Sequence, residues 1–209
     1  KCWWFYVSIL VEKEIKKLSQ TWESIWIDVW LKEFATLSNW EIIWNPKFFS
    51  KSQAKLKKMQ RNLSRKEKGS NRRRKCILKI ARLHRKITRQ REYFLHNIAI
   101  DLVKKYDLIA IEDLNIFWMV KNSKLAKSIS DVSWGKFFSI LSYKAEMFWK
   151  EVKKIDRFFA SSKTCWKCWF VKQDLTLKDR VIKCEKCWEI FDRDLNASKN
   201  ILNFWLRMA

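Results

Sequence analysis

The stretch that decides the fold is Leu108-Ile-Ala-Ile-Glu-Asp113. Its first four residues form a short, wholly apolar run, which predicts a strand buried in the centre of a sheet. The run ends in two acids, and functional side chains are commonly placed where the strands of an α/β sheet end. We therefore expect a central strand that delivers Glu112 to a functional site.

Four segments nearer the N-terminus also have strand character. One alternates weakly, and the other three are short, apolar or β-branched, and punctuated by Asn39 and Pro46. We expect the last three to pair as consecutive antiparallel strands. The four segments are 2–12, 24–30, 33–38 and 41–44.

The chain between these strands and Leu108 is strongly basic. Residues 51–91 contain 18 Lys or Arg and one acid, Glu67, and Gly69-Ser-Asn71 predicts the turn of a helical hairpin at about 51–105. The alternative is a solvated helical surface, but so many like charges repel one another without a polyanion. The residues expected to bind nucleic acid are Lys57, Lys58, Arg61, Arg65, Arg72, Arg73, Arg74, Lys75, Arg82 and Arg85.

Composition narrows the class of protein further. Lys plus Arg number 45 and Asp plus Glu 22, a net charge of +23 that indicates a polyanionic partner. Apolar residues are 48% of the chain and Pro occurs once, which excludes collagen-like and disordered classes. No apolar run is long enough to cross a bilayer, so we expect a soluble intracellular protein without a membrane partner.

Four cysteines form Cys165-x2-Cys168, fifteen intervening residues, and Cys184-x2-Cys187. This spacing is typical of a closed tetrahedral zinc site, because each short loop points two thiolates at one ion. Two disulfides or a redox pair are the alternatives, and an intracellular chain without a βαβ context for the motif argues against both. A helix over 136–150, a strand over 152–159 and a final helix from Asp194 to about Leu206 complete the expected α/β fold.

Three acids stand out by their context. Asp28 lies inside an apolar strand, Glu112 ends another strand, and Asp194 begins the last helix, where a plain N-cap role is equally consistent with the local sequence. Carboxylates from two strands and a helix could converge on two divalent ions, the arrangement used for phosphodiester hydrolysis. Spacing alone does not establish that they do.

The glycine content is anomalous. Gly occurs twice and Trp fourteen times, and the sum of 16 matches the roughly 15 glycines expected of an ordinary chain this long. Trp169 and Trp188 each follow the second Cys of a pair, and Trp40 completes what would be an Asn-Gly turn. We hypothesise that most of these Trp are glycines encoded by UGA and translated with the wrong genetic code. The alternative is a genuinely Trp-rich protein.

Together these motifs resemble the C-terminal half of the TnpB (OrfB) transposon-encoded proteins, relatives of the type V CRISPR effectors. Trp26-Ile-Asp-Val-Trp30 resembles the family's Gly-Ile-Asp-x-Gly, and Ile111-Glu-Asp-Leu-Asn115 resembles its Glu motif. The resemblance places Trp118, Trp149 and Trp205 at family glycines, whereas Trp134 matches a family Trp. Further matching blocks are 133–135, 143–145, 161–169 and 187–197.

The resemblance implies an RNase H-like (RuvC-like) mixed sheet with a helical insertion and an inserted four-cysteine zinc ribbon. Relatives carry an N-terminal region that recognises the guide duplex and the target's flanking motif, and only its last strand would remain here. The implied division is 1–12 for the end of that region, 13–164 for the nuclease core, 165–188 for the zinc-binding target-nucleic-acid module and 189–209 for the final nuclease helix.

The implied activity is that of an RNA-guided DNA endonuclease, a family often described as transposases. Asp28, Glu112 and Asp194 would bind two Mg²⁺, and Cys165, Cys168, Cys184 and Cys187 would hold one Zn²⁺. The implied partners are a DNA target and a guide RNA, in a prokaryotic cytoplasm at the nucleoid. The alternatives are a catalytically inactive zinc-ribbon remnant that binds nucleic acid, and a DDE-type transposase that joins strands itself.

Overall fold

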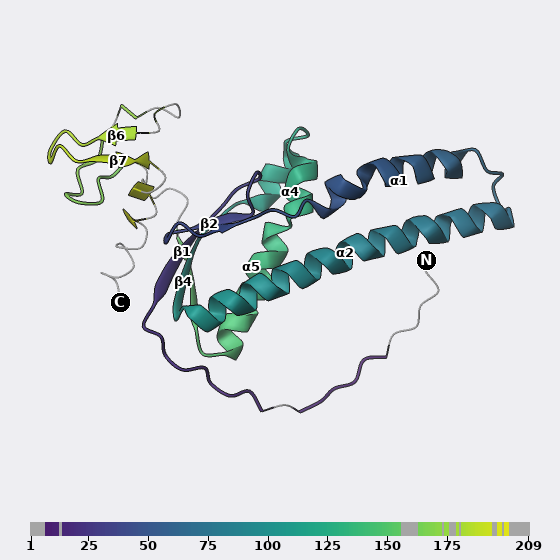
Figure 1. The fold of residues 1–209 in the computed structure, drawn as a ribbon, viewed down its shortest axis with the longest axis horizontal. Helices are drawn as coiled ribbons and strands as arrows, with labels where there is room; N and C mark the ends of the chain where they lie inside the picture. The colour runs from purple at the N-terminus through teal and green to yellow at the C-terminus, as the bar shows by residue number, and fades with distance from the viewer. Residues whose placement is uncertain are drawn as a thin grey trace.

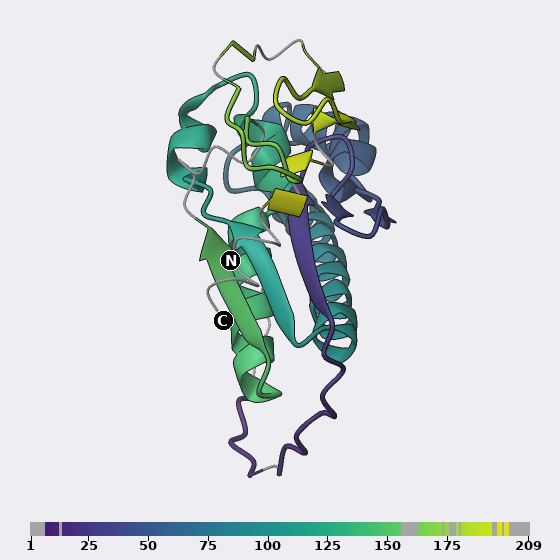
Figure 2. The ribbon, with the colours of Figure 1, turned by 90° about the vertical axis from the view of Figure 1, so that its left-hand side faces the viewer.

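A computed structural model gives a mixed α/β architecture in which one sheet is backed by helices and a long helical hairpin projects from it (Figure 1). Figure 2 looks onto the sheet face opposite the helices. The structure describes residues 7–12, 14–155, 163–172, 174–175, 179, 181–193, 196–197 and 199–200.

The helices and strands follow one another from a strand-rich start to a small β-module. Their bounds are β1 Ser24–Val29, β2 Ala35–Leu37, β3 Ile42–Ile43, α1 Phe48–Ser64, α2 Asn71–Lys105, β4 Leu108–Glu112, α3 Ile116–Lys121, α4 Ala126–Val132, α5 Trp134–Met147, β5 Glu151–Ile155, β6 Val181–Lys183 and β7 Ile190–Asp192.

The main sheet has the strand order β3-β2-β1-β4-β5. Strands β1, β2 and β3 pair antiparallel, whereas β4 lies parallel to both β1 and β5. This pairing confirms the three consecutive antiparallel strands. The buried strand at Leu108 is also confirmed, because Ile109, Ala110 and Ile111 are at most 1% exposed. The fold class of a mixed α/β sheet therefore holds.

The two faces of the sheet have different surroundings. Ile25, Ile27, Ile109 and Ile111 point to the face that packs against α2 and α5 and form the main core with them. Since side chains alternate along a strand, the residues between them point to the opposite face. That face carries a small cluster of Trp26, Ala110 and Ile155.

Helix α2 serves two structural purposes along its 35 residues. Its first half packs against α1 in the basic hairpin, where Cys76 and Ile87 are buried. Its second half lies on the sheet, with Leu95 and Ala99 fully buried in the main core. The Ser70 hydroxyl caps the start of α2 by accepting the Arg73 backbone N–H at 3.1 Å.

Some sequence predictions are wrong or incomplete. Residues 7–12 form no strand, because they have no hydrogen-bonded neighbour strand and are exposed. Helices α3 and α4 were not predicted. The strand expected at 152–159 is observed as β5, Glu151–Ile155, and residues 156–159 lie outside the described part. Residues 1–6 of the first expected strand also lie outside it. The same is true of most of the helix expected from Asp194 to Leu206.

Five tryptophans have left-handed backbone conformations. Their φ angles lie between 57° and 71°, a region that residues with a Cβ rarely adopt. The other non-glycine residues with positive φ in the described part are Lys47 and Ser133. This concentration supports the hypothesis that the codons of these tryptophans specify glycine. The five are Trp22, Trp40, Trp149, Trp169 and Trp188.

By contrast, Trp134 occupies an ordinary core position. It is 2% exposed, begins α5, and donates its indole N–H to the Phe34 carbonyl at 3.4 Å. The structure thus separates a tryptophan that fills the core from tryptophans at glycine-like turns.

Among the helices of the described residues, none is both long and apolar enough to traverse a lipid bilayer.

Candidate functional site

Asp28 and Glu112 lie at the same level on two neighbouring parallel strands. Ile27 of β1 is paired with Ile111 of β4, and each acid is the next residue along its strand. Neighbouring strands are about 4.8 Å apart, so this register brings the two carboxylates close together on one face of the sheet. The strand arrangement thus unites two of the three predicted acids, which are 84 positions apart along the chain.

The end of β4 holds Glu112 in place through backbone hydrogen bonds. The Asp113 N–H donates to the Ile155 carbonyl at 3.0 Å, and the Leu114 N–H donates to the Glu112 carbonyl at 3.0 Å. The Glu112 side chain is half-buried, and burial raises the pKa of its carboxyl above the ordinary value. A carboxylate at this position gains from a cation beside it.

Asp194, the third predicted acid, lies outside the described residues. The chain on either side of it is described, because β7 ends at Asp192 and Asn196 follows. Figure 2 shows β7 beyond the end of the sheet at which β1 and β4 finish, the end that carries Asp28 and Glu112.

Two buried asparagines connect the final segment to the cysteine module. Asn196 accepts the Trp166 N–H at 2.9 Å and donates to the Thr164 carbonyl at 2.6 Å, and Asn200 donates to the same carbonyl. Both side chains are fully buried. Sequence reasoning missed them, although their spacing of four residues places them on one face of a helix.

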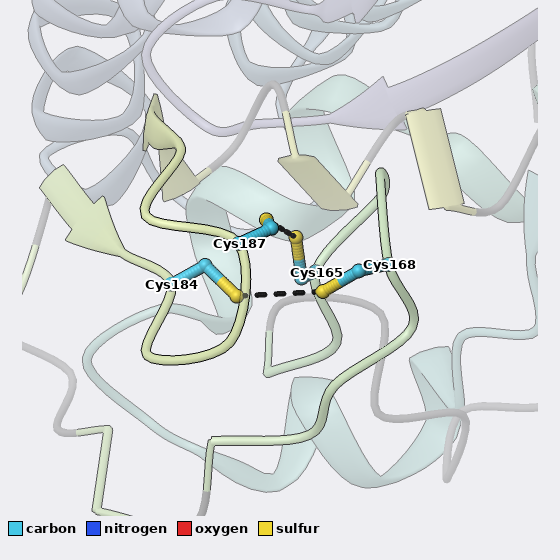
Figure 3. A group of neighbouring side chains, drawn as sticks. All are labelled: Cys165, Cys168, Cys184 and Cys187. Carbon is cyan, nitrogen blue, oxygen red and sulfur yellow. Dashed lines mark hydrogen bonds between the residues drawn. The ribbon is translucent and has the colours of Figure 1, made fainter.

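The four predicted cysteines form one compact group (Figure 3). Their Sγ atoms all lie within 4.8 Å of one another, and the Cys165–Cys187 and Cys168–Cys184 pairs are 3.6 and 3.5 Å apart. These separations exceed the about 2.05 Å of a disulfide, and a tetrahedral set of four thiolates suits a single metal ion such as zinc. The residues present therefore fit a structural metal.

Each CxxC pair is shaped by a tight backbone turn. The Trp169 N–H donates to the Cys165 carbonyl at 2.9 Å, and the Trp188 N–H donates to the Cys184 carbonyl at 3.1 Å. Burial acts to raise the pKa of Cys184, but hydrogen bonds that include those from the backbone N–H groups of Cys187 and Lys186 bring it down to about 7. The turns thus favour a thiolate at Cys184, the form that binds metal.

The hairpin presents most of its predicted nucleic-acid-binding residues to solvent, but Arg73 has a structural position. Its guanidinium donates to the Leu63 carbonyl at 2.9 Å and the Lys66 carbonyl at 3.1 Å, which closes the end of α1 onto the start of α2. Arg85 is half-buried and has interactions of its own. The exposed members of the predicted set are Lys57, Lys58, Arg61, Arg65, Arg72, Arg74, Lys75 and Arg82.

Comparison with known proteins identifies the family. Residues 7–123, more than half of the chain, match the OrfB family of the IS605 type, described as "Probable transposase". The chain belongs to the OrfB (TnpB) family. Residues 134–201 of this OrfB-family chain match a second family, "Cas12f1-like, TNB domain". The matched range contains the four cysteines.

Curated relatives extend along almost the whole chain. A Streptomyces pristinaespiralis protein named "Putative RNA-guided DNA endonuclease" is 42% identical over 95% of this chain and 49% of its own length. Escherichia coli InsQ, with the same descriptive name, is 30% identical over 96% of this chain and 54% of its own. The chain spans about half the length of the curated relatives it matches.

Two solved structures share the fold of this OrfB-family chain. A Cas12f1–sgRNA–target DNA complex gives a TM-score of 0.53 at 21% identity, over 86% of this chain and 48% of that one. A CRISPR–Cas12f ternary complex gives a TM-score of 0.55 at 21% identity, over 93% of this chain and 41% of that one. At these identities the likeness concerns the fold.

Proposed function

We propose that this chain is the nuclease part of a TnpB-type DNA endonuclease that hydrolyses phosphodiester bonds and is guided by RNA in its longer form. The observation that carries the proposal is the adjacent register of Asp28 and Glu112 at the end of two parallel strands. The mixed sheet supports an RNase H-like (RuvC-like) core over 13–164, followed by the cysteine module proposed at 165–188 and the final helical segment proposed at 189–209. Strand β7, Ile190–Asp192, pairs with β6, so the module extends past residue 188.

Asp28, Glu112 and Asp194 are the proposed catalytic acids, and their carboxylates would hold two Mg²⁺. Bound divalent ions would activate a water and stabilise the leaving 3′ oxygen. Asp28 and Glu112 are fixed by a sheet rather than by a loop, so their oxygens keep one relative position during substrate binding. Because burial raises the pKa of the Glu112 carboxyl, a nearby cation would favour its ionised form.

The cysteine module would hold Zn²⁺ through Cys165, Cys168, Cys184 and Cys187 and is proposed to contact target nucleic acid. A zinc ion there would supply structural cross-linking and no chemistry, since four thiolates leave no open coordination position. Among the described residues, the apolar core beside the thiolates is small: Ile182 and Phe191 are buried, and Trp166, Phe170 and Leu175 pack against them. The module therefore depends on its metal for stability.

The proposed location is the prokaryotic cytoplasm, where target DNA and guide RNA are found.

The direct test is cleavage of end-labelled DNA by the chain with Mg²⁺ and, in parallel, by the chain fused to the N-terminal region of a close relative with its guide RNA. Asp28→Ala, Glu112→Ala and Asp194→Ala should each reduce product to the level seen with EDTA. Asp101→Ala removes an exposed acid from α2 and should cleave as the parent does. Equal product from all four variants would remove the nuclease proposal and leave a nucleic-acid-binding module.

A further inference from the structure

The helical hairpin has two unequal sides. On α2, Arg72, Lys75, Lys79, Arg82, Lys86 and Arg89 recur at spacings of three and four residues, which places them in one row along the helix. On α1, a second row of the same kind contains Lys51, Lys55 and Lys58. All members of both rows are exposed.

A groove between the helices shows that the two rows share one side of the hairpin. Its volume is about 320 Å³, and residues of both rows line it together with two apolar side chains. Helices α1 and α2 are antiparallel neighbours (Figure 1). The shared groove therefore places the rows side by side where Lys55 faces Lys79, Arg82 and Lys86. The lining residues are Lys55, Met59, Lys79, Arg82, Leu83 and Lys86.

We infer that this side of the hairpin, here termed the cationic track and defined by the nine residues of the two rows, is a docking surface for the phosphate backbones of a nucleic-acid double helix. The inference deepens the proposed function and rests on it for the class of partner. It also changes the sequence-based prediction, because Lys51, Lys55, Lys79, Lys86 and Arg89 were not in the predicted set.

The length and straightness of the track fit a double helix. From Arg72 to Arg89 the row spans 17 residue steps, or about 26 Å at about 1.5 Å per residue. A duplex rises by about 3.4 Å per base pair, so the row extends beside about eight base pairs. A rigid row of cations can follow a stiff duplex over this length without either partner bending.

The chemistry of the track favours paired over unpaired strands. Residues 51–92 contain no Phe, Tyr or Trp. Proteins that bind single strands combine cations with aromatic rings on which unpaired bases stack. A surface with cations and no rings can contact phosphates but offers nothing to exposed bases, so it suits a helix whose bases are already stacked.

Charge neutralisation on the track and away from it tests the inference. The track variant is Lys79→Gln, Arg82→Gln and Lys86→Gln. The matched control is Lys68→Gln, Lys104→Gln and Lys124→Gln, which removes the same charge from exposed residues outside both the track and the sequence-predicted set. Circular dichroism confirms that both variants fold. Fluorescence anisotropy of the zinc-loaded protein, with no Mg²⁺ present, measures affinity for a DNA duplex, an RNA duplex and an unstructured single strand. Each probe is about 20 nucleotides long, and the measurement covers a range of salt concentrations.

We expect both duplexes to bind more tightly than the single strand, and the tighter duplex identifies the source of the helix. Three lost phosphate contacts should lower the slope of log K against log salt for the DNA duplex by about 2.7 in the track variant. The control should keep the parent slope. Equal slopes for the two variants, an unchanged slope in the track variant, or a single strand bound as tightly as the duplexes would overturn the inference. Because no Mg²⁺ is present to support cleavage, this outcome is independent of the nuclease test.

Discussion

The Lys150 amine and the Asp107 carboxylate form an ion pair where the three parallel strands of the sheet begin. The same amine donates to the Ser19 carbonyl at 2.8 Å, and the Asp107 carboxylate accepts the N–H groups of Thr21 at 2.8 Å and Trp22 at 2.6 Å. The Lys150 side chain is only 2% exposed. This pair therefore ties the segment before β1 to the starts of β4 and β5.

Replacing Asp107 by Asn should destabilise the protein strongly. The Lys150 charge would stay buried without its counter-ion, which costs about 3 kcal/mol in the free energy of unfolding measured with urea. Glu151→Gln is the matched control, because it removes an exposed ion pair with Lys153 and should cost less than about 1 kcal/mol. Equal losses in the two variants would contradict a structural role for the buried pair.

The same carboxylate predicts a loss of stability in acid. Burial acts to raise the pKa of Asp107, but the hydrogen bond from Lys150 and those from the Trp22 and Thr21 N–H groups outweigh it and lower the pKa. A pKa lowered by folding contributes stability above the ordinary value of about 3.9, and this contribution is lost as the pH falls through the folded value. Urea unfolding at neutral and acid pH should therefore show a smaller acid loss for Asp107→Asn than for the parent.

Glu112 should behave in the opposite way. Because burial raises its pKa, the folded protein holds the proton more tightly than the unfolded chain, and stability falls as the pH rises from the ordinary value through the folded one. In buffer without Mg²⁺ at neutral pH, Glu112→Gln should therefore raise the melting temperature of the zinc-loaded protein. Added Mg²⁺ should stabilise the parent and not this variant. Glu146→Gln, at an exposed position of α5, should change neither result.

The left-handed tryptophans predict gains from substitution. Trp169→Gly and Trp188→Gly should each stabilise the zinc-loaded protein by about 1 kcal/mol, because glycine adopts positive φ without a Cβ clash. Trp134→Gly should instead cost at least about 3 kcal/mol, since it empties a buried site. Guanidinium unfolding measures all three. Stability lost at Trp169 and Trp188, or UGG codons there, would count against the glycine hypothesis.

Removal of the metal should unfold the small module without unfolding the sheet. Cys184→Ser should lose bound zinc. The backbone amides of β6 and β7 should then exchange hydrogen faster than in the parent, while the amides of β4 stay protected. Cys76→Ser is the control, because this buried cysteine lies in the hairpin, apart from the cluster. Parent-level zinc in Cys184→Ser would argue against a four-cysteine site.

Local patterns predicted much of the architecture. The apolar run at Leu108, the turn at Gly69 and the two CxxC pairs correctly indicated a buried strand, a helical hairpin and a compact cysteine group. Each of these signals lies within a few residues, where periodicity or spacing determines the structure directly. The alternating pattern was misleading for 7–12, the described part of the strand expected at 2–12, since a strand also requires a partner that short-range sequence does not reveal.

Long-range relationships were beyond the reach of the pattern. The meeting of Asp28 and Glu112 depends on the parallel register of β1 and β4, which is set by tertiary packing. The structural use of Arg73 depends on where the end of α1 falls, and the cationic track on which faces of two helices coincide. Charge counting identified the basic region but could not divide it into sides.

Helix α2 joins the cationic track to the sheet without a break, over about 52 Å. Its first half carries the row of cations, and its second half is fixed in the core beneath β1 and β4 (Figure 1). A double helix seated on the track would be held at a constant offset from Asp28 and Glu112. The length of α2 would then set the distance along the substrate between the docked part of the double helix and the position of the cut.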